Sequence, residues 1–416
     1  MTAGPPVLGG AALPAVLLSR VRGAAAELRR RGIGPGSRVA VAPGSADDVL
    51  AWFLGADLVG AAALVLEPGW AVREREAVLD DARPDVTVGG PVGPGPDGVV
   101  GAAARGNAFY LPTTSGSSGR PKVLQRSRDS WLRSFAALGP VPGPVLIAGP
   151  LSSSLFLFGA LHALWSGVPV RFRPRLTVTD AREAGTVHVV PAMLGQLADQ
   201  DLGDLRTIVC GGAHLPCELR ERVRGPEIVE YYGSAEHSLI ALRRGGGPLR
   251  VVAGVEVEER AGELWVRSPL AFDGYLRGGA LDPAPAWSGV GDRGTVAGDV
   301  VTVAGRGGAM ISTGGRLVAA EAVEAALRGL PAVDDVLVAG TPHPRLGALV
   351  TAVVQSEGTP SLALLRAAAR EGLLPEARPR RWLVVKALPR TASGKVARAA
   401  VVEAIANGTL DAGPLR

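Results

Sequence analysis

Hydroxyl and glycine residues crowd a short segment that directly follows an apolar stretch of the chain. Its members are Thr113, Thr114, Ser115, Gly116, Ser117, Ser118, Gly119 and Lys122. Glycines let the backbone approach an anion, hydroxyls donate hydrogen bonds to it, and the lysine adds positive charge, so the segment predicts a phosphate-binding loop. The GxxxxGK[ST] spacing of a Walker loop is absent. A flexible surface linker is the alternative for a Ser/Gly run taken alone.

A second segment places two aromatic rings close to a carboxylate. It reads Tyr231, Tyr232, Gly233, Ser234, Ala235, Glu236. An aromatic face suits a purine ring, and carboxylate oxygens suit a hard cation such as Mg²⁺. In isolation, a Tyr-Gly pair near a glutamate is typical of an ordinary strand end.

Lysine is almost absent from this chain. Only Lys122, Lys386 and Lys395 occur among 44 basic residues, so the other 41 are arginines. Arginine therefore occupies almost every position that needs only a positive charge. A lysine that remains indicates that a compact ammonium is needed at its position. Lys395 ends the Ser-Gly loop of residues 391–395, which favours a functional role over that of a solvated surface charge.

Together these segments resemble the superfamily of acyl-CoA synthetases, adenylation domains and luciferases, whose loop reads close to TSGTTGxPK and whose second segment reads YGxTE. Gly291-Asp292, Gly305-Arg306 and Leu388 to Lys395 follow in the order typical of that superfamily. Gly211, Gly212 and Ala213 resemble its loop beneath the nucleotide. In its compactness the chain is similar to small acyl-CoA ligases such as o-succinylbenzoate-CoA ligase.

The resemblance implies a role for each matched residue. Tyr232 would stack on adenine and Glu236 would bind the magnesium that accompanies ATP. Asp292 would hold the ribose hydroxyls, and Arg306 would contact ribose or phosphate. The ATP/AMP-binding set also includes Tyr231, Gly233, Ser234 and the residues of the phosphate and 211–213 loops. Lys395 would be the catalytic lysine that meets the negative charge growing at the α-phosphate.

The implied function is ATP-dependent ligation of a small carboxylic acid to a thiol, with CoA as the acceptor. We expect the acid pocket to include Ser153, Ser154, His188 and His237. One alternative keeps adenylation but loads the phosphopantetheine arm of a carrier protein, or activates an unusual small acid such as nitrite. Another is a degenerate nucleotide-binding protein without turnover, because Val123, Ala235 and Gly308 depart from the superfamily pattern.

Alternating helix and strand patterns predict an α/β fold with covered parallel sheets. We expect helices over 17–31, 48–59, 72–81, 155–165, 321–330 and 362–371. Expected strands cover 39–41, 62–66, 108–111, 145–148, 168–172, 186–190, 207–210, 262–267, 335–339 and 350–354, with a hairpin joining 295–296 to 300–303. The pattern favours a large domain over 1–305, made of layered α/β subdomains and a β-rich subdomain, and a small α+β domain over 306–416, with a glycine hinge at 305–308. The resemblance implies that the large domain is the adenylation (AMP-binding) domain and that the small domain is mobile.

Bulk composition excludes several classes of protein. With 47% hydrophobic residues the 416-residue chain can form buried cores, yet it has no apolar stretch long enough to span a bilayer, so we expect a cytoplasmic enzyme. Its two cysteines, Cys210 and Cys217, are too few for a disulfide framework or a zinc site. The net charge of +5 is spread along the chain, which argues against nucleic-acid binding. The sequence does not predict an oligomeric state.

Overall fold

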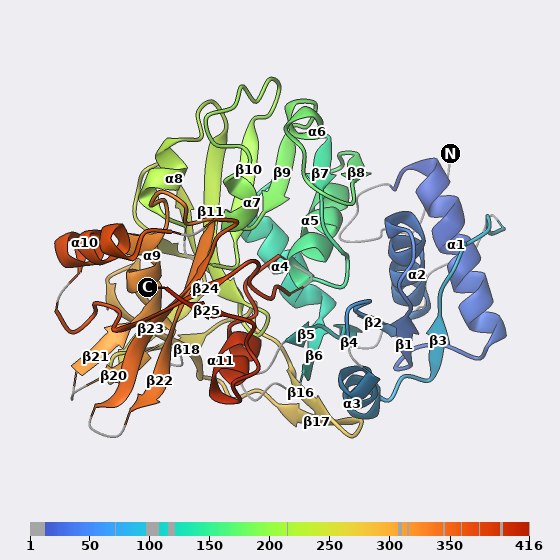
Figure 1. Ribbon diagram of the computed structural model, residues 1–416. Helices are drawn as coiled ribbons and strands as arrows, with labels where there is room; N and C mark the ends of the chain where they lie inside the picture. Colours follow the sequence, from blue (N-terminus) through green and yellow to red (C-terminus); the bar gives the residue numbers. More distant parts are fainter. Residues whose placement is uncertain are drawn as a thin grey trace. The chain divides into compact units, whose positions relative to one another are not determined.

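The computed structural model in Figure 1 describes most of the chain. The described residues are 13–70, 72–96, 108–114, 121–213, 215–306, 310–313, 316–343, 346–358, 360–373, 375–391 and 394–415. They divide into two compact units. The first contains the described residues up to 257 and residues 266–288, and the second contains 258–265 and the described residues from 289 onward.

One sheet of the first unit has a parallel half and an antiparallel half. In spatial order the strands are β3 (Val86–Val88), β1 (Arg38–Val41), β2 (Ala62–Val65), β4 (Ala108–Tyr110), β6 (Lys122–Ser127), β16 (Gly274–Arg277) and β17 (Ala280–Pro283). The pairs from β3 to β4 are parallel, and those from β4 onward are antiparallel. β5 (Thr113–Thr114) pairs with β6. Helices α1 (Ala15–Arg30), α2 (Ala46–Val59), α3 (Val72–Ala82) and α4 (Arg128–Leu138) accompany this sheet.

The second sheet of this unit carries the carboxyl-terminal strand edges that matter for function. Its order is β8 (Val170–Phe172), β7 (Val145–Ile147), β9 (Thr186–Val189), β10 (Thr207–Gly211), β11 (Glu227–Ser234), β12 (Ser238–Arg244) and β13 (Arg250–Val251). The strands from β8 to β11 are parallel and stand side by side in Figure 1. The helices between them are α5 (Ser154–Trp165), α6 (Val178–Arg182), α7 (Pro191–Leu194) and α8 (Cys217–Glu221).

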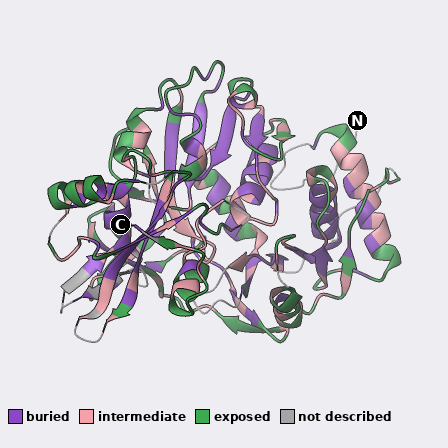
Figure 2. Ribbon diagram, viewed as in Figure 1, coloured by how far each residue is buried: buried purple, intermediate pink, exposed green. Residues whose placement is uncertain are grey.

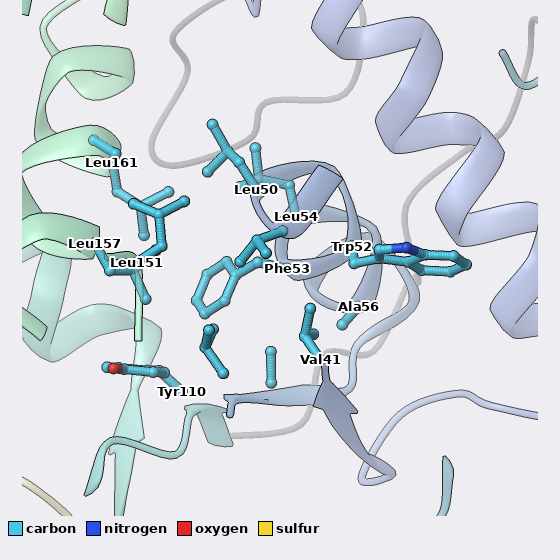
Figure 3. Packing of buried hydrophobic residues seen from close by; sticks show 14 of the residues in the cluster. Val41, Leu50, Trp52, Phe53, Leu54, Ala56, Tyr110, Leu151, Leu157 and Leu161 are labelled. Carbon is cyan, nitrogen blue, oxygen red and sulfur yellow. The ribbon is translucent and has the colours of Figure 1, made fainter. Parts of the chain in front are cut away.

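Helix α2 is mostly apolar and is buried on every side: every residue from Val49 to Val59 is buried, including Asp57, which pairs with Arg128 (Figure 2). A helix of this kind must be covered all round. Helix α1 packs on it through a close approach of Gly55 to Ala24, where a Cβ on Gly55 would lie 2.5 Å from the Ala24 Cβ. Figure 3 shows Phe53 of α2 turned toward Tyr110, and its ring meets those of Phe109 and Tyr110 edge-on, with centroids 5.2 and 5.6 Å apart.

The second unit begins with β strands. β14 (Glu256–Arg260) and β15 (Glu263–Arg267) come first along the chain. β18 (Ser288–Ala297) and β19 (Val300–Arg306) then form a hairpin that closes at Ala297 and Val300 around Gly298. This is the hairpin predicted from the sequence.

The carboxyl-terminal part of the second unit is a sheet covered by helices. Its strands are β20 (Met310–Thr313), β21 (Arg316–Ala319), β22 (Asp335–His343), β23 (Gly347–Gln355), β24 (Arg381–Val385) and β25 (Gly413–Pro414). Its helices are α9 (Ala320–Leu327), α10 (Leu362–Gly372) and α11 (Arg398–Ala406). Val323 and Leu327 of α9 pack into the same core as Val336 and Val354 of the sheet.

Most predicted elements are present, with differences at their ends. Helix α9 ends at Leu327 rather than at 330, because Arg328 is extended and Gly329 takes a φ of +90°. β6, α4, β11 and β12 are strands and helices that the sequence patterns did not predict. The predicted hinge at 305–308 stays a prediction, since 307–309 lie outside the described residues. Among the described helices, none combines the length and hydropathy needed to cross a membrane.

The Phe53 cluster generates a stability prediction. Replacing Phe53 with alanine leaves a cavity next to two aromatic rings, so we expect the free energy of unfolding of the first unit to fall by about 3–5 kcal/mol. Urea unfolding followed by tryptophan fluorescence measures this change. The control is Val72→Ala, whose side chain is 73% exposed, and which should change the midpoint little. Equal effects of the two substitutions would contradict the packing described here.

Candidate functional site

The carboxyl ends of β10 and β11 bring two predicted segments together. The strands are parallel, and Gly211 lies opposite Tyr231 in their register. Ligands of open α/β sheets bind at this edge. The segments 211–213 and 231–236, which are far apart in the sequence, therefore form one candidate site.

Tyr231 and Tyr232 point to opposite faces of the sheet because successive strand residues alternate. The Tyr231 ring lies across Gly211, where a Cβ would sit 2.3 Å from ring carbons Cε1 and Cζ. Only one of these two tyrosines can stack on a given adenine ring. The two tyrosines, which were both predicted to bind the nucleotide, therefore lie in two different places relative to it.

Gly233 allows the tight turn that follows. The register between β11 and β12 shifts between Tyr232 and Gly233, and a Cβ on Gly233 would lie 1.8 Å from the carbonyl oxygen of Ser238. Any side chain would force the strands apart. The turn therefore holds Glu236 at a fixed place beside the strand edge.

His237 fastens this turn. Its backbone N–H donates to the Ser234 hydroxyl at 3.2 Å, its Nδ1 lies 3.0 Å from the same oxygen, and its Nε2 lies 2.8 Å from the Ser288 hydroxyl. Burial lowers the pKa of His237 to about 4, so the ring is neutral at pH 7. Because both ring nitrogens have partners within the fold, we interpret His237 as a residue that positions the turn.

Glu236 and Lys122 meet at one tyrosine. The Tyr275 hydroxyl donates to Oε1 of Glu236 at 3.2 Å, and the Lys122 ammonium lies 5.3 Å from the centroid of the Tyr275 ring. Burial raises the pKa of Tyr275, and the Glu236 carboxylate raises it further. The phenol therefore stays protonated and remains a donor to Glu236.

A buried arginine supports this group, and sequence reasoning missed it. Arg126 is 1% exposed, and its guanidinium donates to the carbonyls of Ala235 at 2.6 Å, Glu236 at 3.2 Å and Leu270. Burial lowers its pKa to about 10, which leaves it charged at neutral pH. The available signal was the alternation of β6, which places Arg126 on the same face as the buried Leu124.

The flanks of the predicted phosphate loop are paired strands. Thr114 lies opposite Lys122, and Thr113 lies opposite Val123, so β5 and β6 bring the two ends of the loop together. Ser115, Gly116, Ser117, Ser118 and Gly119 lie outside the described residues. Val123 is fully buried in a core with Leu276 and others, which accounts physically for an apolar residue at this position.

Three of the four predicted acid-pocket residues lie on two neighbouring elements, and the fourth, His237, lies in the turn between β11 and β12. Ser153 and Ser154 begin α5, and the Ser154 hydroxyl lies 3.3 Å from that of Tyr110. His188 is buried on β9, with its ring centroid 5.9 Å from that of His162. Burial lowers the pKa of His188 to about 3, with a smaller contribution from His162. Among the described residues no partner binds its Nε2.

The second unit holds the remaining predicted residues. Asp292 is buried on β18 and lies opposite Arg306 of β19 in the hairpin register. The Lys395 carbonyl accepts a hydrogen bond from the Thr391 N–H at 2.7 Å. The Arg390 side chain donates to the nearby Gly394 carbonyl at 3.0 Å.

The described residues contain no cluster of three or more His, Cys, Asp or Glu side chains that could enclose a metal ion. Mg²⁺ in nucleotide sites is commonly held by one or two carboxylates together with the phosphates. A single carboxylate at Glu236, oriented by Tyr275, fits that arrangement.

Two family models match the chain. The model described as AMP-binding enzyme covers residues 15–106 and 98–276, and the one described as AMP-binding enzyme C-terminal domain covers residues 322–395. The chain belongs to the AMP-binding enzyme family. The predicted membership of the adenylate-forming superfamily is confirmed.

Similar proteins of this family are named as ligases. An uncharacterized acyl-CoA ligase, YhfT of Bacillus subtilis, is 29% identical over 70% of this chain and 68% of its own length. A probable 2-succinylbenzoate-CoA ligase of Mycobacterium tuberculosis is 32% identical over 74% of this chain and 87% of its own. The predicted class, an AMP-forming acid-CoA ligase, is confirmed.

Solved structures with the same fold include a variant of E. coli MenE with bound OSB-AMS and MatB from Rhodopseudomonas palustris with bound ATP. The first has a TM-score of 0.83 at 22% identity and covers 94% of this chain and 92% of that one. The second has a TM-score of 0.80 at 22% identity, with coverages of 94% and 93%. The predicted α/β fold class of this AMP-binding enzyme is confirmed.

The buried histidines generate a pH prediction. The pKa values of His162, His188 and His237 fall from 6.5 to about 4, 3 and 4, chiefly through burial. Below pH 6.5 the unfolded chain binds protons at these histidines and the folded chain does not. The free energy of unfolding therefore keeps its full contribution from them above pH 6.5 and falls as the pH drops toward 4. In urea unfolding between pH 5 and 6, His188→Phe should lower the proton uptake by about one. If the dependence of the free energy of unfolding on pH were the same in His188→Phe and in the wild type, the buried neutral state of His188 would be contradicted.

Proposed function

We propose that this AMP-binding enzyme joins a small carboxylic acid to CoA through an acyl-adenylate. The observation that carries the proposal is the shared contact of Glu236 and Lys122 with Tyr275, beside the carboxyl edge of β10 and β11. A carboxylate that can bind a cation and an ammonium that can bind phosphate therefore lie at the same tyrosine. That pairing suits a triphosphate that arrives with its metal.

In this proposal the nucleotide lies along the strand edge. Adenine stacks on Tyr232, the backbone of Gly211 to Ala213 contacts the base, and the 113–122 loop binds the phosphates. Asp292 accepts hydrogen bonds from the ribose hydroxyls, and Arg306 contacts ribose or phosphate.

Glu236 holds Mg²⁺ in the same proposal. When bound, the ion neutralises charge on the phosphates and favours departure of pyrophosphate. Tyr275 fixes the carboxylate by donating to Oε1, and Arg126 fixes the backbone beneath it. The chain therefore presents the carboxylate in one orientation before the nucleotide binds.

The first half-reaction needs no protein nucleophile. An oxygen of the substrate carboxylate attacks the α-phosphorus, and the bond to pyrophosphate breaks. The Lys395 ammonium stabilises the negative charge that grows on the transferring group. In the second half-reaction the thiol of CoA attacks the acyl carbon, and AMP leaves.

A change in the position of the small domain would separate the two half-reactions. Gly305 has a φ of +118°, a conformation in which L side chains are strained, and it precedes the predicted hinge at 305–308. The backbone freedom of glycine would therefore allow the small domain to rotate.

Lys395→Ala tests the catalytic assignment. We expect ATP–pyrophosphate exchange to fall at least about 100-fold while ATP binding, followed by calorimetry, changes little, because the ammonium acts on the transition state. The matched control is Lys386→Ala, another lysine of the second unit, whose side chain is exposed. Exchange that survives Lys395→Ala at the control level would refute the role.

The acceptor is tested by supplying different thiols to the adenylated enzyme. We expect thioester formation with CoA, in line with the names of the curated relatives. Faster transfer to a phosphopantetheinylated carrier protein would favour the alternative acceptor. Absence of magnesium-dependent ATP turnover with every acid tested, nitrite included, would leave a nucleotide-binding protein without turnover.

A further inference from the structure

The chain runs antiparallel on the two sides of the segment that carries Lys395. Arg390 and Val396 face each other in an isolated antiparallel β-bridge. Lys395 directly precedes Val396, so it lies at the end of a narrow loop with two stems. An ammonium on a flexible four-carbon chain keeps one position best when the backbone that bears it is held by other side chains. What anchors the two stems therefore bears on how Lys395 acts.

The first stem is anchored by the guanidinium of Arg390. Its Nη2 donates to Oδ2 of Asp335, the first residue of β22, at 2.5 Å, and its Nη1 donates to the Gly394 carbonyl at 3.0 Å. One side chain thus joins β22 to the residue directly before Lys395. Asp335 is itself held, because its Oδ1 accepts a hydrogen bond from the Val336 N–H at 2.8 Å.

The second stem is anchored by Arg398, the first residue of α11. Its Nη2 donates to Oε1 of Glu324 at 2.5 Å, and its Nη1 donates to the Val338 carbonyl at 2.7 Å. The same Oε1 accepts a hydrogen bond from the Val338 N–H at 2.7 Å, which closes a ring of contacts. Glu324 is 5% exposed, and a carboxylate buried to this degree needs a partner of opposite charge. The pair therefore holds Arg398 in one place.

Arg328 lies between the two carboxylates that hold the stems. Its Nε is 3.6 Å from Oδ1 of Asp335, and its Nη2 is 3.9 Å from Oε2 of Glu324. Charges of alternating sign therefore lead from one stem of the loop to the other. We call this group the stem network, and its members in order are Arg390, Asp335, Arg328, Glu324 and Arg398.

The placement of the stem network indicates more than a role in holding the second unit together. Both stems are tied to one strand, since Asp335 and Val338 both belong to β22. The Arg390 side chain is 34% exposed, and ion pairs that are open to solvent add little to stability. The contact of Arg390 with Asp335 thus contributes little to folding, yet it reaches the loop of Lys395.

We propose that the stem network positions Lys395 for the attack on the α-phosphorus, with Arg390 and Arg398 as positioning residues that act through the lysine. The inference rests on the proposed function, in which Lys395 serves the first half-reaction. A displacement of about 1 Å at a reacting group can cost about 100-fold in rate. Loosening one stem should therefore slow adenylation and leave acyl transfer to CoA largely intact.

Arg390→Ala in the full-length enzyme tests the proposal, with the best of acetate, octanoate, benzoate and succinate as the acid. We expect kcat for ATP–pyrophosphate exchange to fall about tenfold while the KM for ATP changes less than about twofold. Acyl transfer to CoA from the supplied adenylate of the same acid should change less than about twofold. The control is Arg366→Ala, at an exposed position of α10, which should leave both half-reactions unchanged.

Double substitutions test whether Arg390 acts through Lys395. In the Lys395→Ala background, Arg390→Ala should cost less than about twofold in addition, because the group that it positions is gone. Asp335→Asn should reproduce the loss of exchange, and Arg390→Ala should add little to it. A further loss of about tenfold in either background would overturn the inference.

Arg398→Lys tests the second stem without removing the charge that faces Glu324. Lysine lacks the planar fork that reaches two oxygens at once, so we expect exchange to fall about fivefold or more while acyl transfer is retained. An equal loss in the two half-reactions would show general disruption of the second unit, and would overturn the positioning role.

The outcomes separate this inference from the proposed function. If Lys395→Ala loses exchange while Arg390→Ala keeps it at the level of the Arg366→Ala control, the proposed function stands and the stem network has no positioning role. If Lys395→Ala keeps exchange, or if none of the acids supports it in the wild type, the inference fails together with the proposed function.

Discussion

The charge of one buried guanidinium holds the candidate site of the first unit together. Arg126 extends from β6, the strand that begins with Lys122, and donates to the carbonyls of the turn that carries Glu236. It also donates to Leu270, in the segment that leads to Tyr275. Without this side chain three backbone carbonyls, of which that of Leu270 belongs to a buried residue, would lose a partner, at a cost of a few kcal/mol. The positions of the carboxylate, the phenol and the ammonium all depend on it.

Elements with a strong hydrophobic period were predictable, and those defined by tertiary pairing were not. Helices α2 and α5 have long apolar runs and were found within two residues of their ends. β6 mixes lysine, glutamine and arginine with apolar residues, and it becomes a strand because β4, β5 and β16 pair with it. Such partners are distant in the sequence, so no local pattern indicates them.

In the candidate site, too, the residues with a recognisable local pattern were predictable and those defined by tertiary contacts were not. The 231–236 segment was predictable from its residue types, because an aromatic face and a carboxylate have recognisable chemistry. Arg126 was missed because charged residues are ordinarily solvated, and Tyr275 because it lies 39 positions from the carboxylate to which it donates. The opposite orientation of Tyr231 and Tyr232 also needed a strand, since only alternation separates adjacent residues. The departure at Val123 has a structural reason, because this side chain fills a core. Ala235 binds Arg126 through its backbone carbonyl, which any residue would supply, so nothing in the structure explains the alanine there.

The contact between Gly211 and the ring of Tyr231 also constrains how this enzyme could change over evolutionary time. A side chain cannot be gained at position 211 while the ring covers it, whereas the ring can be lost first without a collision. Mutational paths at this contact are therefore directional: position 231 must become smaller before position 211 can vary. Descendants of this sequence would record that order, with glycine at 211 wherever an aromatic ring persists at 231.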